Sequence, residues 1–122
     1  MILADTSVWV DHLRRGNRKL AELLETRGIL SHPFIVGEIA LGHLAPRNQV
    51  LKDLQDLPQC TVASDEEVLG LIERHQLFGR GIGYVDAHLV AAVMLTPGSA
   101  IWTLDNRLNR VAEALGTTVK IK

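Results

Sequence analysis

Several features that would place a protein in a specialised class are missing from this chain. There is one cysteine, Cys60, so an internal disulfide is excluded, and no cysteine–histidine group has the spacing of a zinc site. No stretch approaches 18 consecutive apolar residues, which excludes a transmembrane helix. The opening residues 1–5 have no basic segment before their apolar stretch, which argues against a signal peptide. We therefore expect a cytoplasmic protein without membrane contact.

Aromatic side chains and an excess of charge are also scarce. Aromatic residues make up 4% of the chain, which disfavours a surface that stacks bases on rings. The net charge is -1, from 13 basic and 14 acidic residues, and gives no general attraction to nucleic acid. If four of the acids hold a metal, the remaining 13 basic and 10 acidic residues carry a charge of +3. Any nucleic-acid partner would then be bound through its phosphates.

What remains is the pattern of an ordinary folded domain. The chain has 122 residues, 47% of them hydrophobic, which fits a single domain spanning residues 1–122 with its own core. Short apolar runs predict strands at 2–4, 29–31, 60–62 and 100–104, and a final edge strand at Val119 and Ile121. Helical patterns separate them. This alternation predicts an α/β domain with a short, mainly parallel sheet of four to five strands flanked by helices.

Helix boundaries follow from capping residues. Thr6 or Ser7 is expected to cap the first helix, and Asn17 the second. Pro33 suits the first position of a third helix that runs to about residue 44. Ser64 with Glu67 forms a capping-box signature. The segment 84–95 is apolar on almost every side, which predicts a central helix.

Four carboxylates occupy positions that suit a binding site. Asp5 and Asp105 each follow a predicted strand, at the sheet edge where ligands bind in open parallel sheets. Glu38 and Asp86 lie on predicted helices, where the residues three and four positions away are apolar and offer no Lys or Arg. An unpaired carboxylate in apolar surroundings is costly, so each needs a partner or a proton.

A divalent cation would satisfy all four acids together. Oxygen donors without cysteine or paired histidine select Mg²⁺ or Mn²⁺, and water bound to such an ion can attack a phosphodiester. Thr6, Ser7 and Thr103 place hydroxyls beside these acids, suited to orienting water or a phosphate oxygen. Each acid also has a purely structural interpretation. Asp105 can be a helix cap, Asp86 a first-turn acid favoured by the helix dipole, Asp5 a turn or cap residue, and Glu38 an ordinary satisfied acid.

Other motifs are weaker. The densest basic cluster is Arg14, Arg15, Arg18 and Lys19, which is either a solvated loop or a contact to a nucleic-acid backbone beside the acids. The glycine-rich segment 79–83 lacks the spacing of a dinucleotide site and is expected to be a loop, although Arg80 could touch a phosphate. No nucleophile elbow accompanies Ser7.

The order of these motifs resembles the PIN-domain family, in particular the VapC toxins of toxin–antitoxin pairs. The resemblance rests on an apolar strand followed by Asp5-Thr6-Ser7, on Glu38 in the third helix, on Asp86 opening the central helix, and on Thr103-Leu104-Asp105-Asn106-Arg107-Leu108. It covers the whole chain. Each motif alone is weak, and four in the right order are fairly specific.

The resemblance implies a sandwich of helices around a short parallel sheet and a Mg²⁺- or Mn²⁺-dependent endoribonuclease. In that family Asp5, Glu38, Asp86 and Asp105 would form the acidic pocket, with Thr6, Ser7 and Thr103 as supporting polar groups. It also implies a homodimer and a cognate antitoxin that covers the site, with operator DNA bound only through the antitoxin. Two amphipathic helices could offer the antitoxin a groove, through residues that are otherwise core: Leu20, Leu23, Leu24, Val50, Leu51 and Leu54.

Three alternatives remain open. A structure-specific DNase of the flap-nuclease type shares the carboxylate chemistry but needs more acids and a strand-threading element. A non-enzymatic module with an acidic Mg²⁺ pocket, such as a phosphoacceptor receiver, needs neighbouring acids after the first strand and a later Lys, whereas Thr6 and Ser7 follow Asp5 and Lys120 comes too late. An inactive PIN-like scaffold is the third, and four intact acids argue against it.

Overall fold

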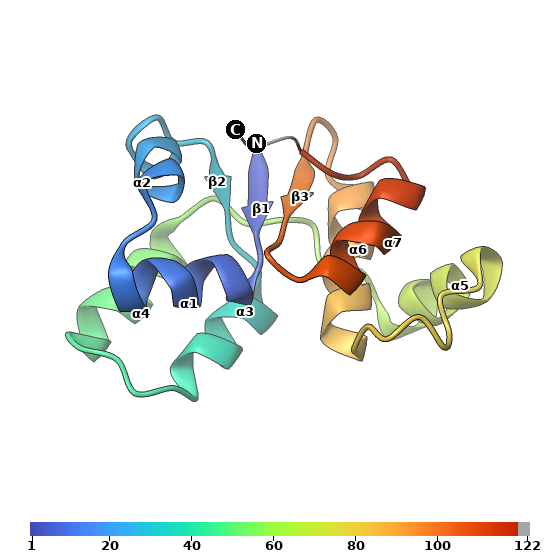
Figure 1. Cartoon of the computed structure of the whole chain (residues 1–122), viewed down its shortest axis with the longest axis horizontal. Coiled ribbons are helices and arrows are strands. Elements are labelled where there is room, and N and C mark those ends of the chain that lie inside the picture. Colours follow the sequence, from blue (N-terminus) through green and yellow to red (C-terminus); the bar gives the residue numbers. More distant parts are fainter. Residues whose placement is uncertain (120–122) are drawn as a thin grey trace.

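A three-stranded parallel sheet lies at the centre of the protein (Figure 1). In this computed structural model, which describes residues 1–119, the strands are β1 (Ile2–Ala4), β2 (Ile29–Leu30) and β3 (Ala100–Trp102). Their order is β2-β1-β3, with Leu3 in register with Leu30 on one side and with Ile101 on the other. Because all three strands run the same way, their carboxyl ends meet at one edge of the sheet. The predicted α/β class and parallel sheet are confirmed.

The sheet is smaller than the four to five strands predicted. Within residues 1–119, the segment 60–62 is not a strand, because only Gln59 pairs there, in an isolated parallel bridge to Ser31. Of the predicted final strand, the described part makes one bridge, between Thr118 and Ile101, and Ile121 lies outside the described residues. Short apolar runs mark both segments correctly as lying beside the sheet. They do not reveal how little of each pairs with it within residues 1–119.

Helices flank the sheet on both sides. Figure 1 shows α1 to α4 on the β2 side of β1 and α5 to α7 on the β3 side. Among the described residues, no helix has the length and apolar character needed to cross a membrane. The helix bounds are α1 (Thr6–Arg15), α2 (Arg18–Glu25), α3 (Pro33–Ala40), α4 (Arg47–Asp56), α5 (Asp65–His75), α6 (Tyr84–Leu95) and α7 (Asn106–Ala114).

Most predicted caps hold the helices in place. The Asn17 side chain accepts the Leu20 amide at 3.0 Å, and Ser64 with Glu67 forms the complete capping box. The predicted cap of α1 was wrong, because Asp5 itself caps the helix by accepting the Val8 amide. Helix α3 ends at Ala40, short of the predicted residue 44.

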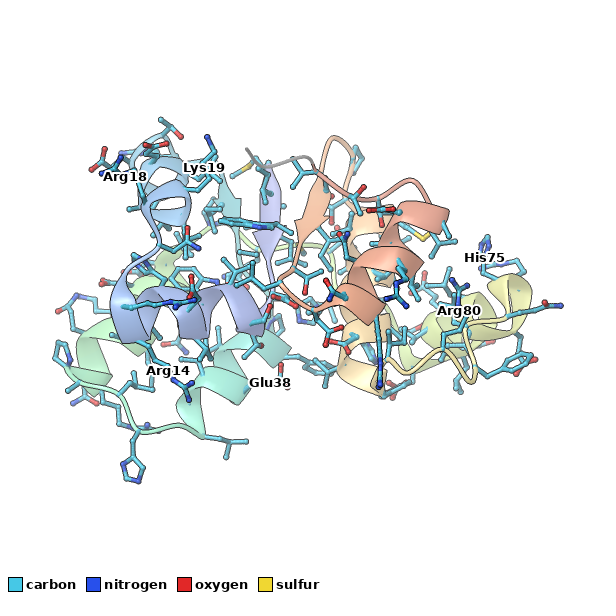
Figure 2. All side chains as sticks on the ribbon, viewed as in Figure 1. Arg14, Arg18, Lys19, Glu38, His75 and Arg80 are labelled. Atoms are coloured by element: carbon cyan, nitrogen blue, oxygen red, sulfur yellow. The ribbon has the colours of Figure 1, made fainter. Side chains whose placement is uncertain are left out.

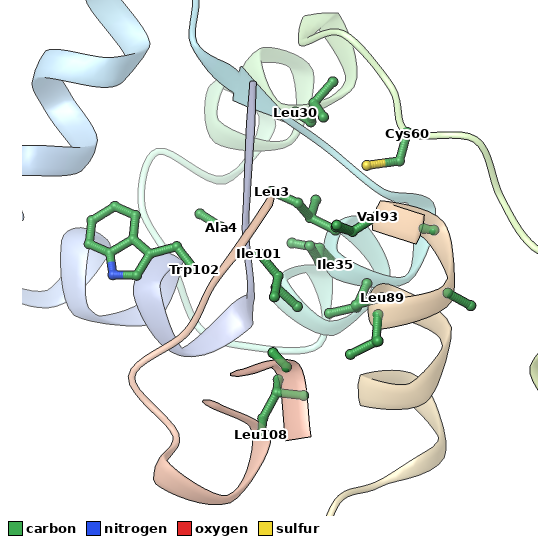
Figure 3. Close-up of a cluster of buried hydrophobic side chains, with 14 of the residues drawn as sticks. Leu3, Ala4, Leu30, Ile35, Cys60, Leu89, Val93, Ile101, Trp102 and Leu108 are labelled. Carbon is green, nitrogen blue, oxygen red and sulfur yellow. The ribbon is translucent and has the colours of Figure 1, made fainter. Parts of the chain in front are cut away.

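The hydrophobic core forms where α3 and α6 pack against the sheet. Figure 3 shows Leu3 and Ile101 from the strands beside Ile35 of α3 and Leu89 and Val93 of α6. Helix α6 has seven consecutive buried residues, 87–93, which confirms its predicted central place. Of the apolar residues on α2 and α4, two are fully buried and four are partly buried against the core: first Leu20 and Leu54, then Leu23, Leu24, Val50 and Leu51.

Candidate functional site

Asp5 occupies the point where β1 ends and α1 begins. Its side chain is buried, with 4% of the residue exposed. The carboxylate accepts hydrogen bonds from the hydroxyls of Ser7 and Thr103, and from the Val8 amide at 3.2 Å. Thr103 follows β3, so this one carboxylate joins the carboxyl ends of two neighbouring strands. The predicted meeting of Asp5, Ser7 and Thr103 at the sheet edge is present in the structure.

Burial dominates the electrostatics of Asp5. Desolvation raises its pKa, and the hydrogen bonds from Ser7, Thr103 and the backbone only partly offset that rise. The ionised carboxylate is therefore held in place at an energetic cost. Among residues 1–119, the ion pairs within 4.0 Å are Arg15–Asp11, Lys19–Glu22 and His88–Asp65, so no described basic side chain compensates Asp5.

The hydroxyls of Ser7 and Thr103 also order the chain after β3. The Leu104 amide donates to Ser7 Oγ at 3.0 Å, and the Asp105 amide donates to Thr103 Oγ1 at 3.0 Å. Asp105 in turn caps α7, accepting the amide of Arg107 at 2.8 Å. The capping interpretation of Asp105 is thus correct. It uses one carboxylate oxygen, Oδ1, and leaves Oδ2 without a described hydrogen bond.

Glu38 extends from α3 towards the start of α1. Its carboxylate accepts the Thr6 hydroxyl at 2.6 Å, which accounts for the predicted polar role of Thr6. The expectation that Glu38 shares a buried apolar face was wrong, because Glu38 is exposed and its neighbour Leu41 is 90% exposed. The apolar spacing on α3 therefore marks the edge of the core, where Ile35 is buried and Leu41 is exposed.

Asp86 brings the four acids into one electrostatic group. It lies in the first turn of α6 and accepts the Gly83 amide at 3.0 Å. Its pKa is raised, first by desolvation and further by the negative charges of Asp5, Asp105 and Glu38, against the lowering effect of the Gly83 bond. The charges of Asp5, Glu38 and Asp105 thus all act on Asp86.

The four acids have the donor chemistry that a hard divalent cation requires. Their side chains are not spaced closely enough to hold such an ion directly. Within residues 1–119, no three or more His, Cys, Asp or Glu side chains are arranged closely enough to hold an ion directly. The donors are oxygen atoms only, two of the acids have raised pKa values, and the ion pairs described above include none of the four. A hard cation would relieve the repulsion that Asp86 experiences, so the chemistry of these donors fits such an ion.

The loop before α6 is packed tightly against α7. Gly81 has a φ of +78°, which favours glycine, and a Cβ at this position would lie 2.7 Å from Cδ of Arg107. Residues 79–83 therefore form a loop, as predicted, but one tied to the helix that Asp105 caps. Arg80 lies on the α5 side of the molecule, far from Arg14 in Figure 2.

The predicted basic cluster is divided by the fold. Arg18 and Lys19 lie on α2, whereas Arg14 lies at the end of α1 on the same side as Glu38 (Figure 2). Arg14 lines a cavity of about 260 Å³ together with Glu38, and a second of about 410 Å³ together with Ser7 and Arg15. Arg15 also pairs with Asp11 at 2.6 Å. The structure places Arg14 beside the acids and keeps Arg18 and Lys19 away from them.

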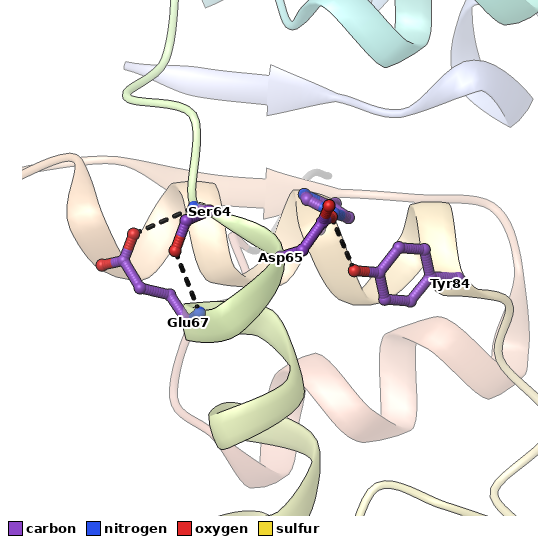
Figure 4. A network of polar contacts seen from close by, with 5 residues as sticks. Ser64, Asp65, Glu67 and Tyr84 are labelled. Carbon is purple, nitrogen blue, oxygen red and sulfur yellow. Dashed lines mark hydrogen bonds and ion pairs between the residues drawn. The ribbon is translucent and has the colours of Figure 1, made fainter.

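The sequence did not predict a polar network between α5 and the first turns of α6, the helix that carries Asp86. Asp65, at the start of α5, accepts the Tyr84 hydroxyl at 2.8 Å and lies 3.0 Å from Nε2 of His88 (Figure 4 shows Asp65 and Tyr84). The available signal was the spacing of Tyr84 and His88, four residues apart on a helix that is otherwise almost wholly apolar.

Comparison with known proteins identifies the family of this fold. Residues 2–114 match the PIN domain family, so the chain belongs to it. Over 119 residues it is 43% identical to the ribonuclease VapC32 from each of two strains of Mycobacterium tuberculosis. The similarity covers 98% of this chain and 96% of each relative. These matches confirm the predicted membership of the PIN-domain family.

Proposed function

We propose that this protein is a Mg²⁺- or Mn²⁺-dependent endoribonuclease, the toxin of a toxin–antitoxin pair, that cleaves a structured RNA such as a tRNA. What carries the proposal is that Asp5, Glu38 and Asp105 lie near enough to Asp86 for their charges to raise its pKa, with no basic partner for any of the four among the described ion pairs. The similarity to ribonucleases over nearly the whole chain supports the choice of RNA as substrate.

In the proposed chemistry, the bound ions and the residues of the chain have different roles. One or two bound ions would supply an activated water and stabilise the charge on the leaving oxygen. A bound ion would stabilise the ionised forms of Asp5 and Asp86 in particular, because desolvation raises the pKa of both. Ser7 and Thr103 hold the Asp5 carboxylate in one orientation, and Thr6 holds that of Glu38. Glu38 and Asp105, both exposed, complete the set from the open side.

Arg14 is proposed to bind the RNA backbone next to the acids, with Arg15 beside it. It lines both cavities that flank α1, one of which contains Glu38 and the other Ser7. A cation at that place offsets the repulsion between the acids and the phosphates that approach them.

Replacement of Arg14 by alanine should therefore weaken RNA binding without blocking the chemical step. We expect KM to rise about fivefold and the salt dependence of binding to lose one phosphate contact, a slope change of about 0.7. The matched control is Arg18→Ala, which removes an exposed arginine of α2 and should leave KM unchanged. Equal effects of the two variants, in cleavage assays over a salt series, would show that Arg14 acts only through net charge.

The proposal includes partners as well as a substrate. We propose a homodimer, which the exposed apolar side chains of Leu69, Met94 and Leu95 on α5 and α6 support. A cognate antitoxin would cover the acidic site and would alone contact operator DNA, by analogy with VapC toxins. Residues 1–122 would act as one nuclease domain in the cytoplasm, where the substrate RNA is found.

The competing functions can be distinguished by the substrate that the protein cleaves. Protein freed of antitoxin should cut total RNA into discrete fragments in Mg²⁺ and leave single-stranded and flap DNA intact. Asp56→Asn, an exposed acid at the end of α4, serves as a matched control and should cut like the wild type. Faster cleavage of flap DNA would favour the DNase, and intact RNA and DNA in every lane would favour a binding module.

A further inference from the structure

Three side chains from two helices meet behind the acidic site. Asp65 is the first residue of α5, and its Oδ1 accepts the Tyr84 hydroxyl at 2.8 Å. The same oxygen lies 3.0 Å from Nε2 of His88. Tyr84 and His88 are four residues apart, so they project from the same face of α6. One carboxylate oxygen of α5 thus holds the first two turns of α6.

Asp86 lies between these two residues in the sequence and faces another way. At 100° per residue, a position two residues from both Tyr84 and His88 projects about 200° away from them, on the opposite side of the helix. On that side the Asp86 carboxylate accepts the Gly83 amide and is repelled by Asp5, Asp105 and Glu38. The hydrogen bonds to Asp65 therefore hold one side of α6, and Asp86 projects from the opposite side of the same turns.

His88 is the buried end of the network. It is 2% exposed, whereas the Asp65 side chain is 78% exposed. The His88 ring is packed edge to face against Tyr84, with the ring centres 4.8 Å apart, and against Phe34 of α3, with the ring centres 4.7 Å apart. Because Nε2 is directed at a carboxylate, Nε2 is the ring nitrogen that carries a proton in this contact. This hydrogen bond therefore fixes both the tautomer and the orientation of a core side chain.

The contact with Phe34 links the network to the helix that carries Glu38. Phe34 donates its amide to Nδ1 of His32, the N-cap of α3, and its ring lies 5.2 Å from that of His32. The helices of Asp86 and Glu38 thus meet through His88 and Phe34, behind the acids that they present. A change in the rotation of α6 would alter this ring packing as well as the direction of Asp86.

We propose that Asp65 is a positioning residue for Asp86: by binding Tyr84 and His88 together, it fixes the rotation of the first two turns of α6 and so aims the Asp86 carboxylate at the acidic site. This role rests on the proposed metal-dependent function for its consequence, and on the described hydrogen bonds for its geometry. Asp65 touches neither substrate nor metal in this arrangement. It acts through α6.

The test compares Asp65→Ala with two matched variants of the same helix turn. Asp65→Asn keeps an oxygen that can accept from both Tyr84 and His88, and so should behave nearly like the wild type. Glu66→Ala removes the neighbouring exposed acid of α5, for which no hydrogen bond is described, and controls for the lost charge at the helix N-terminus. Tyr84→Phe removes one of the two hydrogen bonds and keeps the ring.

Two readouts separate positioning from general destabilisation. Amide hydrogen exchange at residues 87–90 should become about tenfold faster in Asp65→Ala, because local opening of α6 costs less. The affinity for Mn²⁺, measured by calorimetry, should fall about tenfold, the lower end of the effect of an outer-shell partner. In RNA cleavage kcat should fall while KM stays constant. Tyr84→Phe should lie between, and adding it to Asp65→Ala should have no further effect, since the two share one interaction.

The outcomes distinguish this inference from the proposed function. Unchanged exchange at residues 87–90 in Asp65→Ala overturns the positioning role, whatever the metal result. Equal loss in Glu66→Ala overturns it too, since charge alone then explains the effect. If exchange accelerates but the wild type binds no Mn²⁺, Asp65 still fixes α6, and it is the metal-dependent function that fails. Rescue by Asp65→Asn together with weaker Mn²⁺ binding in Asp65→Ala establishes both.

Discussion

Replacing Asp5 by asparagine should abolish RNA cleavage while the protein stays folded. The substitution keeps the size of the side chain and removes the one negative charge that two strands share. Loss of a ligand that stabilises the transition state costs several kcal/mol, which corresponds to about a 1,000-fold fall in kcat/KM. Cleavage of total RNA in Mg²⁺, followed over time for both proteins, measures it.

The same substitution should leave the unfolding temperature equal or higher when no metal is added. Burial raises the pKa of Asp5, so its ionised form destabilises the folded state at neutral pH, and a neutral amide removes that cost. The asparagine oxygen can still accept from Ser7 and Val8, and its NH₂ group can donate to Thr103 Oγ1.

A loss of cleavage together with an equal or higher unfolding temperature in Asp5→Asn would identify Asp5 as a functional residue. A structural acid would lose stability on substitution, and the loss of cleavage would then follow from unfolding. Asp56→Asn, the matched exposed acid, should change neither quantity. Full activity in Asp5→Asn would remove the acid from the proposed machinery and leave the other three to be tested alone.

The positions of Asp5, Asp86 and Asp105 could be predicted because each is tied to a local signal. Asp5 and Asp105 follow apolar runs that become β1 and β3, and parallel strands bring such ends together. Asp86 opens a helix whose apolar character shows that it must be buried. These inferences require only that β1 and β3 are neighbours in the sheet, as they are in the structure.

Contacts between distant segments could not be predicted in the same way. Glu38 was expected on an apolar face, but of the neighbours that give α3 its apolar spacing Ile35 is buried, whereas Phe34 and Leu41 are exposed. The bond between Asp65 and His88 joins residues 23 positions apart and depends on how α5 packs on α6. A capping signature at Ser64 indicates where α5 begins, yet says nothing about what its first residue touches. Such pairings arise from tertiary packing, which leaves no local pattern.

Bound metal should reverse the dependence of stability on pH. The folded pKa values of Asp5 and Asp86 are raised above their unfolded values, so between the two values the folded state binds more protons. Without metal, the free energy of unfolding therefore receives its full contribution from these groups below about pH 4. It loses that contribution as the pH rises through the raised values. A divalent ion favours both ionised forms and should restore the stability at neutral pH.

Thermal unfolding at pH 7 with EDTA or with Mn²⁺ measures this effect. At a concentration 100 times its dissociation constant, a ligand that binds only the folded state contributes about 2.7 kcal/mol, or roughly 10 °C for a domain of this size. In the same titration EDTA should stop RNA cleavage completely. Asp86→Asn should lose most of the shift in unfolding temperature, whereas Asp56→Asn should keep it. A shift that survives in Asp86→Asn would mean that Mn²⁺ binds elsewhere on the chain, and the four acids would then owe their grouping to the fold alone.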